Sequence, residues 1–242
     1  MILKCMVAYA EIVPPSDFFG SASDTGHETS SDMHKMLAAK AREQLLGKLG
    51  RLRSKLTPGE RAFFHGDEIS HRQRVDASWR LEAFQTLLWS LGLATLPHFD
   101  TMAERSILKS FPPENLRASL SAAALRPKAT INKVRDVAEL WHWRSRTREL
   151  IERGDSLAKN QQTATVRTFD DIVRLAVCKA HDDGVMPPPI DDDFPVLGKA
   201  YRSMSAEEWA MVHSITRERH FAMNWLCGYA PRNQWDKTPT DS

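Results

Sequence analysis

Cysteine is scarce in this chain of 242 residues, and its spacing carries no motif. Cys5, Cys178 and Cys227 are odd in number and widely separated, and no C-x-x-C pair occurs. This usage argues against a disulfide framework and against a cysteine-rich zinc site. Reduced thiols fit the cytoplasm, and we therefore expect a cytoplasmic location.

Long apolar runs are also missing. The apolar stretch over residues 1–13 is interrupted by Lys4 and Glu11, and no small-residue cleavage site follows it convincingly. No segment approaches the roughly 18 consecutive apolar residues of a membrane-spanning helix. The first stretch predicts a short strand or docking arm rather than a signal peptide, and we expect no membrane partner.

Neither sign of charge dominates, because 33 basic residues face 31 acidic ones and the formal net charge is +2. No overall field therefore favours nucleic acid. Basic residues do cluster locally, at Arg42, Lys48, Arg51, Arg53, Lys55 and Arg61 and again over residues 126–148. Hydration is the simpler interpretation of a basic helix face, so nucleic-acid binding is the least favoured function.

The motifs of metal and nucleotide chemistry are absent. The sequence has no H-E-x-x-H, no phosphate-binding glycine loop and no G-x-S-x-G elbow, and no two of its nine histidines are four residues apart. The acidic run Asp191, Asp192 and Asp193 lacks the spacing of a calcium loop and predicts a solvated loop. We expect no metal site and no cofactor.

Helical periodicity and helix-ending residues dominate the rest of the chain. Apolar spacing, capping residues, proline and glycine predict helices over residues 32–55, 57–64, 76–93, 100–108, 113–124, 131–153, 169–181 and 205–228. In the first of these helices Met36, Leu37 and Leu52 are expected to face inward, and residues 76–93 form the buried central helix. The prediction is an all-α fold, an irregular orthogonal bundle of about seven to nine helices with at most one short N-terminal strand.

Domain boundaries follow from composition. Residues 14–31 are rich in Ser, Gly, Asp and Thr, so residues 1–31 are expected to be an N-terminal arm and flexible linker. Residues 32–242 then form a single helical domain. The proline-rich stretch over residues 186–195 predicts irregular structure on the surface or over a groove.

Charged residues on apolar helix faces are the strongest functional signal. Glu218 lies in the apolar stripe of the last helix, and Arg144 continues a stripe of the helix over residues 131–153. Arg80 and Glu82 lie in the central helix. Because an isolated buried charge costs several kcal/mol, Glu218 is expected to bond Arg80, Arg144 or Arg126.

A thiol-protease dyad is the sharper alternative for the last helix, where His220, Asn224 and Cys227 occur together. Residues seven apart share a helix face, but a rise of about 1.5 Å per residue separates them by roughly 10 Å along the axis. That distance is too long for a thiolate–imidazole hydrogen bond. We therefore expect packing or surface roles for these residues.

Several motifs resemble a bacterial family known as domain-of-unknown-function family 4272. The matching motifs are Trp79-Arg80-x-Glu82-Ala83, Leu87-Leu88-Trp89-x-Leu91-Gly92, Leu125-Arg126-Pro127, Trp141-x-Trp143, Glu218-Arg219-x-x-Ala222-x-Asn224-Trp225-Leu226, Trp235-Asp236 and Thr240-Asp241. The resemblance implies a helical fold and points to the same charged and aromatic residues. It names no reaction.

The leading hypothesis is a cytoplasmic helical binding or interaction protein, with an unidentified protein or small molecule as its partner. Its buried network or pocket would comprise Arg80, Glu82, Arg126, Trp141, Arg144, Glu218, Arg219, Asn224 and Trp225. A buried ion-pair network that fixes helix register is the favoured role of these residues. The alternative is a hydrolase-type enzyme in which Glu218 acts as general base in a cleft with Arg80 or Arg144.

Overall fold

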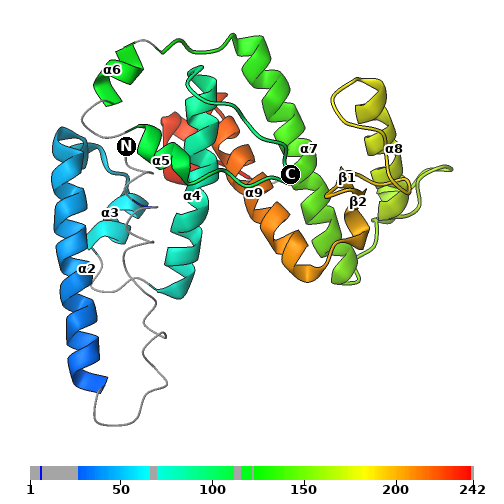
Figure 1. The fold of residues 1–242 in the computed structure, drawn as a ribbon. Coiled ribbons are helices and arrows are strands. Elements are labelled where there is room, and N and C mark those ends of the chain that lie inside the picture. Colours follow the sequence, from blue (N-terminus) through cyan, green and yellow to red (C-terminus); the bar gives the residue numbers. More distant parts are fainter. Residues whose placement is uncertain (1–5, 7–26, 66–69, 112–115, 122, 241–242) are drawn as a thin grey trace. The chain divides into compact units, whose positions relative to one another are not determined.

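The computed structural model describes residues 6, 27–65, 70–111, 116–121 and 123–240, and these residues are mostly helical, as predicted (Figure 1). They fall into two compact units. Unit 1 comprises residues 1–96, 103–126 and 228–239, and unit 2 comprises residues 97–102, 127–227 and 240–242. The single domain expected over residues 32–242 stays a prediction. The predicted N-terminal strand lies outside the described residues.

The described elements of unit 1 are helices and short 3₁₀ turns. Its elements are α2 (His27–Leu49), η2 (Gly50–Lys55), α3 (Pro58–His65), α4 (His71–Ser90), α5 (Ser106–Ser110), α6 (Leu116–Ser121), η5 (Pro231–Asn233) and η6 (Trp235–Lys237). Helix α2 starts five residues before the predicted residue 32, inside the expected linker, because composition is only a weak guide to helix ends.

The first helix of unit 1 also buries fewer residues than predicted. Leu45, Leu46 and Leu49 are buried, whereas Met36 and Leu37 are largely exposed. Helix α2 ends at Leu49 and gives way to a 3₁₀ turn, which shifts the register of the apolar face and leaves Leu52 exposed.

Helix α4 is the most buried helix of unit 1. Ser70 caps it, with Gln73 completing a capping box. Leu81, Ala83 and Phe84 are buried, and so are several polar side chains of the same helix. The predicted capping box of α3 is present too, because the Thr57 N–H donates to Glu60 and the Glu60 N–H donates to Thr57 Oγ1.

Unit 2 pairs two long helices with a small hairpin. Its elements are α7 (Lys128–Glu152), η3 (Lys159–Gln161), α8 (Phe169–Asp182), β1 (Pro195–Val196), β2 (Lys199–Ala200), η4 (Tyr201–Ser203) and α9 (Ala206–Leu226). Helices α7 and α9 lie along one another (Figure 1). Helix α9 begins at the predicted capping box of Ser205 and Glu208.

The proline-rich loop is more ordered than predicted. Its end forms β1, which pairs antiparallel with β2 in the register Pro195 to Ala200 and Val196 to Lys199. Leu197 and Gly198 connect the strands, and both have positive φ, as a type I′ turn requires. The Leu197 N–H donates to Asp100 Oδ2 at 2.9 Å. Asp100 was predicted to cap a helix, but α5 begins only at Ser106.

Within the described part of the chain, no helix is both long and apolar enough to cross a membrane.

Candidate functional site

A buried ion pair joins α7 to the proline-rich loop in unit 2. The Nε and Nη2 atoms of Arg144 each donate to a different carboxylate oxygen of Asp193, both at 2.7 Å. Arg144 is 1% exposed and Asp193 is fully buried. The prediction of a solvated Asp191–Asp193 run is therefore wrong for Asp193, because this carboxylate balances the charge of the arginine inside the unit.

The hydrogen-bond donors around Asp193 keep its side chain ionised. Burial alone would raise its pKa, but the hydrogen bonds and charge of Arg144 outweigh burial, and the net pKa is lowered. The backbone N–H groups of Phe194 and Arg202 also donate to the carboxylate, at 2.7 and 2.9 Å. The Arg144 guanidinium lies 4.5 Å from the ring centre of Tyr201, whose pKa burial raises to about 12.

Trp141 lies at the centre of the aromatic packing of unit 2. This residue is 1% exposed. Four rings surround it, with centroids at 5.5 Å for His98, 5.8 Å for Phe99, 5.4 Å for Phe194 and 6.4 Å for Tyr201. The sequence predicts Trp141 in the network. In the structure it packs against Phe194, whose N–H donates to Asp193, and against Tyr201, whose ring lies under the Arg144 guanidinium.

Arg219 binds the segment over residues 97–101 to α9. Its Nη1 donates to the carbonyl oxygens of Pro97 at 2.7 Å and His98 at 3.0 Å, and its Nη2 donates to that of Thr101 at 2.7 Å. The guanidinium also lies 5.5 Å from the ring centre of Phe99. Three backbone acceptors thus satisfy a cation that is fully buried.

The interface between α7 and α9 carries a chain of polar side chains where two packed helices usually bury apolar ones. Nδ1 of His142 lies 3.1 Å from Nδ1 of His220, and Nε2 of His220 lies 2.9 Å from the Asn224 amide. Arg135 Nε donates to the Asn224 oxygen at 2.9 Å. His142, His220 and Asn224 are all buried.

Arg135 fixes the direction of this chain. An arginine can only donate, so the Asn224 atom facing it is the oxygen, and the Asn224 NH₂ group donates to Nε2 of His220. A neutral His220 therefore carries its proton on Nδ1 and donates it to Nδ1 of His142. His142 then carries its own proton on Nε2.

The two histidines of this polar row, His142 and His220, are neutral at physiological pH. Burial lowers the pKa of His142 to about 3, followed by repulsion from His220 and His213 when they are protonated and from Arg146 and Arg217. Burial, with the charge of Arg135, lowers the pKa of His220 to about 4. The neutral forms agree with the direction of the hydrogen bonds.

Ser145, His213 and Glu149 have the residue types of a charge relay but a different geometry. Ser145 Oγ lies 2.8 Å from Nδ1 of His213, and Glu149 Oε1 lies 3.7 Å from that same nitrogen. A relay needs the acid on one imidazole nitrogen and the nucleophile on the other. Ser145 is also fully buried, so the arrangement is a packing contact.

Glu218 is 2% exposed, as the sequence predicts for a carboxylate in an apolar stripe. Arg217 Nη2 lies 3.3 Å from its Oε1. The predicted pairing with Arg144 is wrong, because Asp193 takes that guanidinium. Arg80 and Arg126 belong to unit 1, and their pairing with Glu218 stays a prediction.

The remaining predicted residues of unit 1 have local roles. Glu82 is buried, and its Oε1 accepts the backbone N–H of Ala103 at 2.7 Å. Arg126 Nε donates to the Trp89 carbonyl oxygen at 2.7 Å, and its guanidinium lies 5.0 Å from the Trp89 ring centre. Arg80 in α4 is partly exposed, as is Trp225 in α9 of unit 2.

Sequence reasoning missed Asp193, His142, His213 and Arg135. His213 and His220 are seven residues apart on one helix, and this spacing could have shown a shared polar face. Nothing in the local sequence distinguishes Asp193 from Asp191 and Asp192, because its partner lies 49 residues away. Among the residues described, no three His, Cys, Asp or Glu side chains gather in a group that could hold a metal ion.

Cys227 takes no part in the polar chain. Its Sγ contacts Asn132 Oδ1 at 3.4 Å, while His220 bonds His142 and Asn224. These partners agree with the rejection of a thiol-protease dyad.

Comparison with known proteins adds a family but no activity. The family described as "Domain of unknown function (DUF4272)" matches residues 26–169. No curated protein and no solved structure matches the chain. The matched region includes α7, whereas α9 and Asp193 lie beyond its end.

Proposed function

This chain belongs to domain-of-unknown-function family 4272, and from its buried residues we propose that it is a non-catalytic binding or interaction protein of the cytoplasm. Its partner is a protein or a small molecule. One observation carries the proposal: the buried cations Arg144 and Arg219 of unit 2 find their hydrogen-bond acceptors within the protein itself. The Asp193 carboxylate accepts two hydrogen bonds from Arg144, and three backbone carbonyl oxygens accept hydrogen bonds from Arg219.

Internally paired charges stabilise a scaffold rather than perform chemistry. A catalytic acid or base must reach a substrate atom within about 3 Å. Asp193 and Arg144 are sealed from solvent, and the two neutral histidines bond each other. The contact between His142 and His220 supports a role in fixing the register of α7 against α9, and the pair of Arg144 and Asp193 supports the same role for the proline-rich loop against α7.

A hydrolase with Glu218 as general base is the alternative. The burial of Glu218 gives no direct support to this role. Arg144 is bonded to Asp193 and is therefore not available to hold an anionic group of a substrate. The alternative therefore depends on Glu218 and Arg80 alone.

A comparison of the full chain with a Glu218→Gln variant tests the proposal. Both proteins are assayed with chromogenic esters, phosphoesters, amides and glycosides, after circular dichroism has shown that the variant folds. We expect neither protein to exceed the rate of buffer. Turnover by the full chain that Glu218→Gln abolishes would establish the hydrolase and overturn the proposal.

The binding half of the proposal needs its own measurement. Tagged full chain, expressed in its own host, is purified from the cytoplasmic fraction and analysed by size exclusion with light scattering. We expect a complex of fixed stoichiometry that contains this chain. Recovery of the chain outside the cytoplasm, or only as free protein, counts against the proposal.

A further inference from the structure

Four exposed basic side chains lie in the last turn of α2 and in the 3₁₀ turn η2 that follows it in unit 1. We call Lys48, Arg51, Arg53 and Lys55 the basic turn. All four are exposed, and the sequence has no acidic residue between Glu43 and Glu60. Glu60 is buried and accepts the Thr57 N–H, so its carboxylate serves the cap of α3.

The basic turn differs from most cations of unit 2, because no acidic partner is found for any of its four side chains among the residues that the structure describes. Most basic residues of unit 2 form ion pairs, namely Arg135, Arg144, Arg146, Arg148, Arg153, Arg174, Lys179, Lys199, Arg202 and Arg217. None of the four residues of the basic turn pairs with an acidic residue that the structure describes. Within the described part of the chain, no carboxylate therefore neutralises the positive charge of the basic turn.

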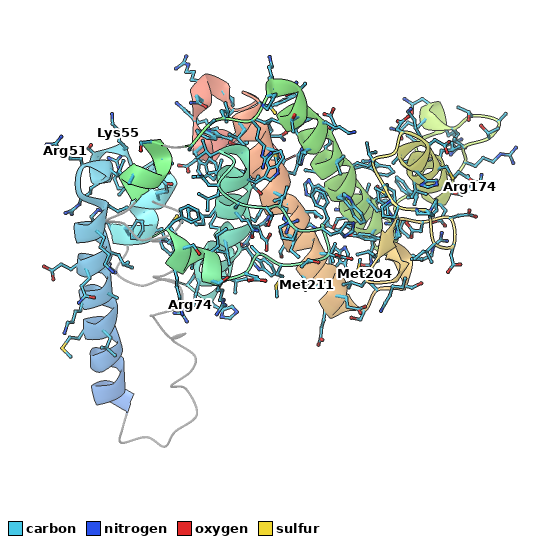
Figure 2. The ribbon with its side chains drawn as sticks, turned by 45° about the horizontal axis from the view of Figure 1, so that its top comes forward. Arg51, Lys55, Arg74, Arg174, Met204 and Met211 are labelled. Atoms are coloured by element: carbon cyan, nitrogen blue, oxygen red, sulfur yellow. The ribbon has the colours of Figure 1, made fainter. Side chains whose placement is uncertain are left out.

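The backbone holds the basic turn in place. Leu49 and Leu56, immediately before and after η2, are both 3% exposed. Gly50 has a φ of +50°, which lets the chain leave α2 and enter the 3₁₀ turn. The Leu56 N–H closes the turn on the Arg53 carbonyl. Arg51 and Lys55 point outward from this turn (Figure 2).

We propose that the basic turn binds the phosphate backbone of double-stranded nucleic acid without reading its sequence. Four exposed cations on an anchored turn supply the positive charge that a row of closely spaced phosphates attracts. Single-stranded nucleic acid would need exposed aromatic rings for stacking, and the aromatic residues that follow the basic turn in the chain, Phe63 and Phe64, are buried. Insertion into a membrane would need more apolar surface than Leu52 offers. This inference goes beyond the proposed function and does not depend on it.

The test measures binding of the full chain to a fluorescent mixed-sequence duplex of about 20 base pairs by anisotropy, at salt concentrations from roughly 50 to 200 mM. Four phosphate contacts predict a slope of log affinity against log salt of about −3.6. An Arg51→Gln/Arg53→Gln variant should bind about tenfold more weakly and reduce the slope by about 2. Both substitutions are on exposed side chains, and thermal unfolding checks the fold of the variant.

The matched control is an Arg153→Gln/Arg174→Gln variant, which removes the same charge from exposed positions that have acidic partners. Its affinity should change less than about twofold. Equal losses in the two variants would show a general charge effect and overturn the proposal. Undetectable duplex binding at low salt would overturn it too, as would binding to phosphatidylserine vesicles with none to the duplex.

Discussion

His142 and His220 face each other from α7 and α9 with their Nδ1 atoms 3.1 Å apart. Two neutral imidazoles can make this contact only when one donates and the other accepts. Arg135 decides which one donates, through Asn224, so a surface-proximal cation fixes the position of a proton in the buried interface.

The first prediction concerns these protons. At pH 7.5, His220 should be the Nδ1–H tautomer and His142 the Nε2–H tautomer. The ring ¹⁵N chemical shifts of histidine-labelled protein distinguish the two tautomers, and His142→Gln and His220→Gln variants assign the signals. Observation of His220 as the Nε2–H tautomer would mean that the direction argued from Arg135 is wrong.

The second prediction concerns pH and stability. The pKa of His142 is lowered to about 3, so the unfolded chain, with an ordinary histidine pKa of 6.5, binds the proton at higher pH than the folded chain does. The stability that His142 contributes is present above pH 6.5 and is lost as pH falls below it. The loss from this residue should be on the order of 2 kcal/mol between pH 6.5 and 5.

Denaturant unfolding at several pH values checks this dependence. His142→Gln should show a shallower loss of stability between pH 6.5 and 5 than the unchanged chain. His71→Gln, at an exposed histidine in the first turn of α4, is the control and should keep the original slope. Identical slopes for all three proteins would contradict a buried neutral His142.

The third prediction compares two adjacent aspartates. Asp193→Asn removes the charge that balances buried Arg144 and should lower the free energy of unfolding by about 3 kcal/mol or more. Asp192→Asn changes an exposed residue whose φ of +61° asparagine tolerates, so its effect should stay within about 0.5 kcal/mol. Chemical denaturation measures both variants, and equal effects would show that the Arg144–Asp193 pair contributes little.

The fourth prediction concerns the segment that Arg219 holds. Arg219→Lys keeps the charge but cannot reach three carbonyl oxygens in the geometry of a guanidinium, so the segment over residues 97–101 should exchange its amide hydrogens faster. The expected loss of stability is about 2 kcal/mol. Hydrogen–deuterium exchange with mass spectrometry reports the segment directly. The control is Arg174→Lys, at an exposed site in α8, which should leave the amide exchange of residues 97–101 unchanged.

Local patterns predicted the helices because their causes are local. The capping boxes at Thr57 and Ser205 each depend on residues three apart, and both are present as predicted. The buried state of Arg144 and Glu218 also followed from helical periodicity. Their partners did not, because Asp193 is one of three adjacent aspartates and only the hairpin after it turns this carboxylate inward. The burial of the polar chain between α7 and α9 depends in the same way on which faces of two distant helices meet.

The packing of α7 against α9 limits how this protein can be shortened. The family match ends at residue 169, so a fragment cut there would keep α7 and lose α9, the loop and the hairpin. Trp141 would lose Phe194 and Tyr201, and Arg144 would lose its counter-ion. In such a fragment the Trp141 indole would keep only His98 and Phe99 of its four ring neighbours, and Arg144 would have lost its carboxylate, so we expect the smallest fragment that folds to extend through Leu226.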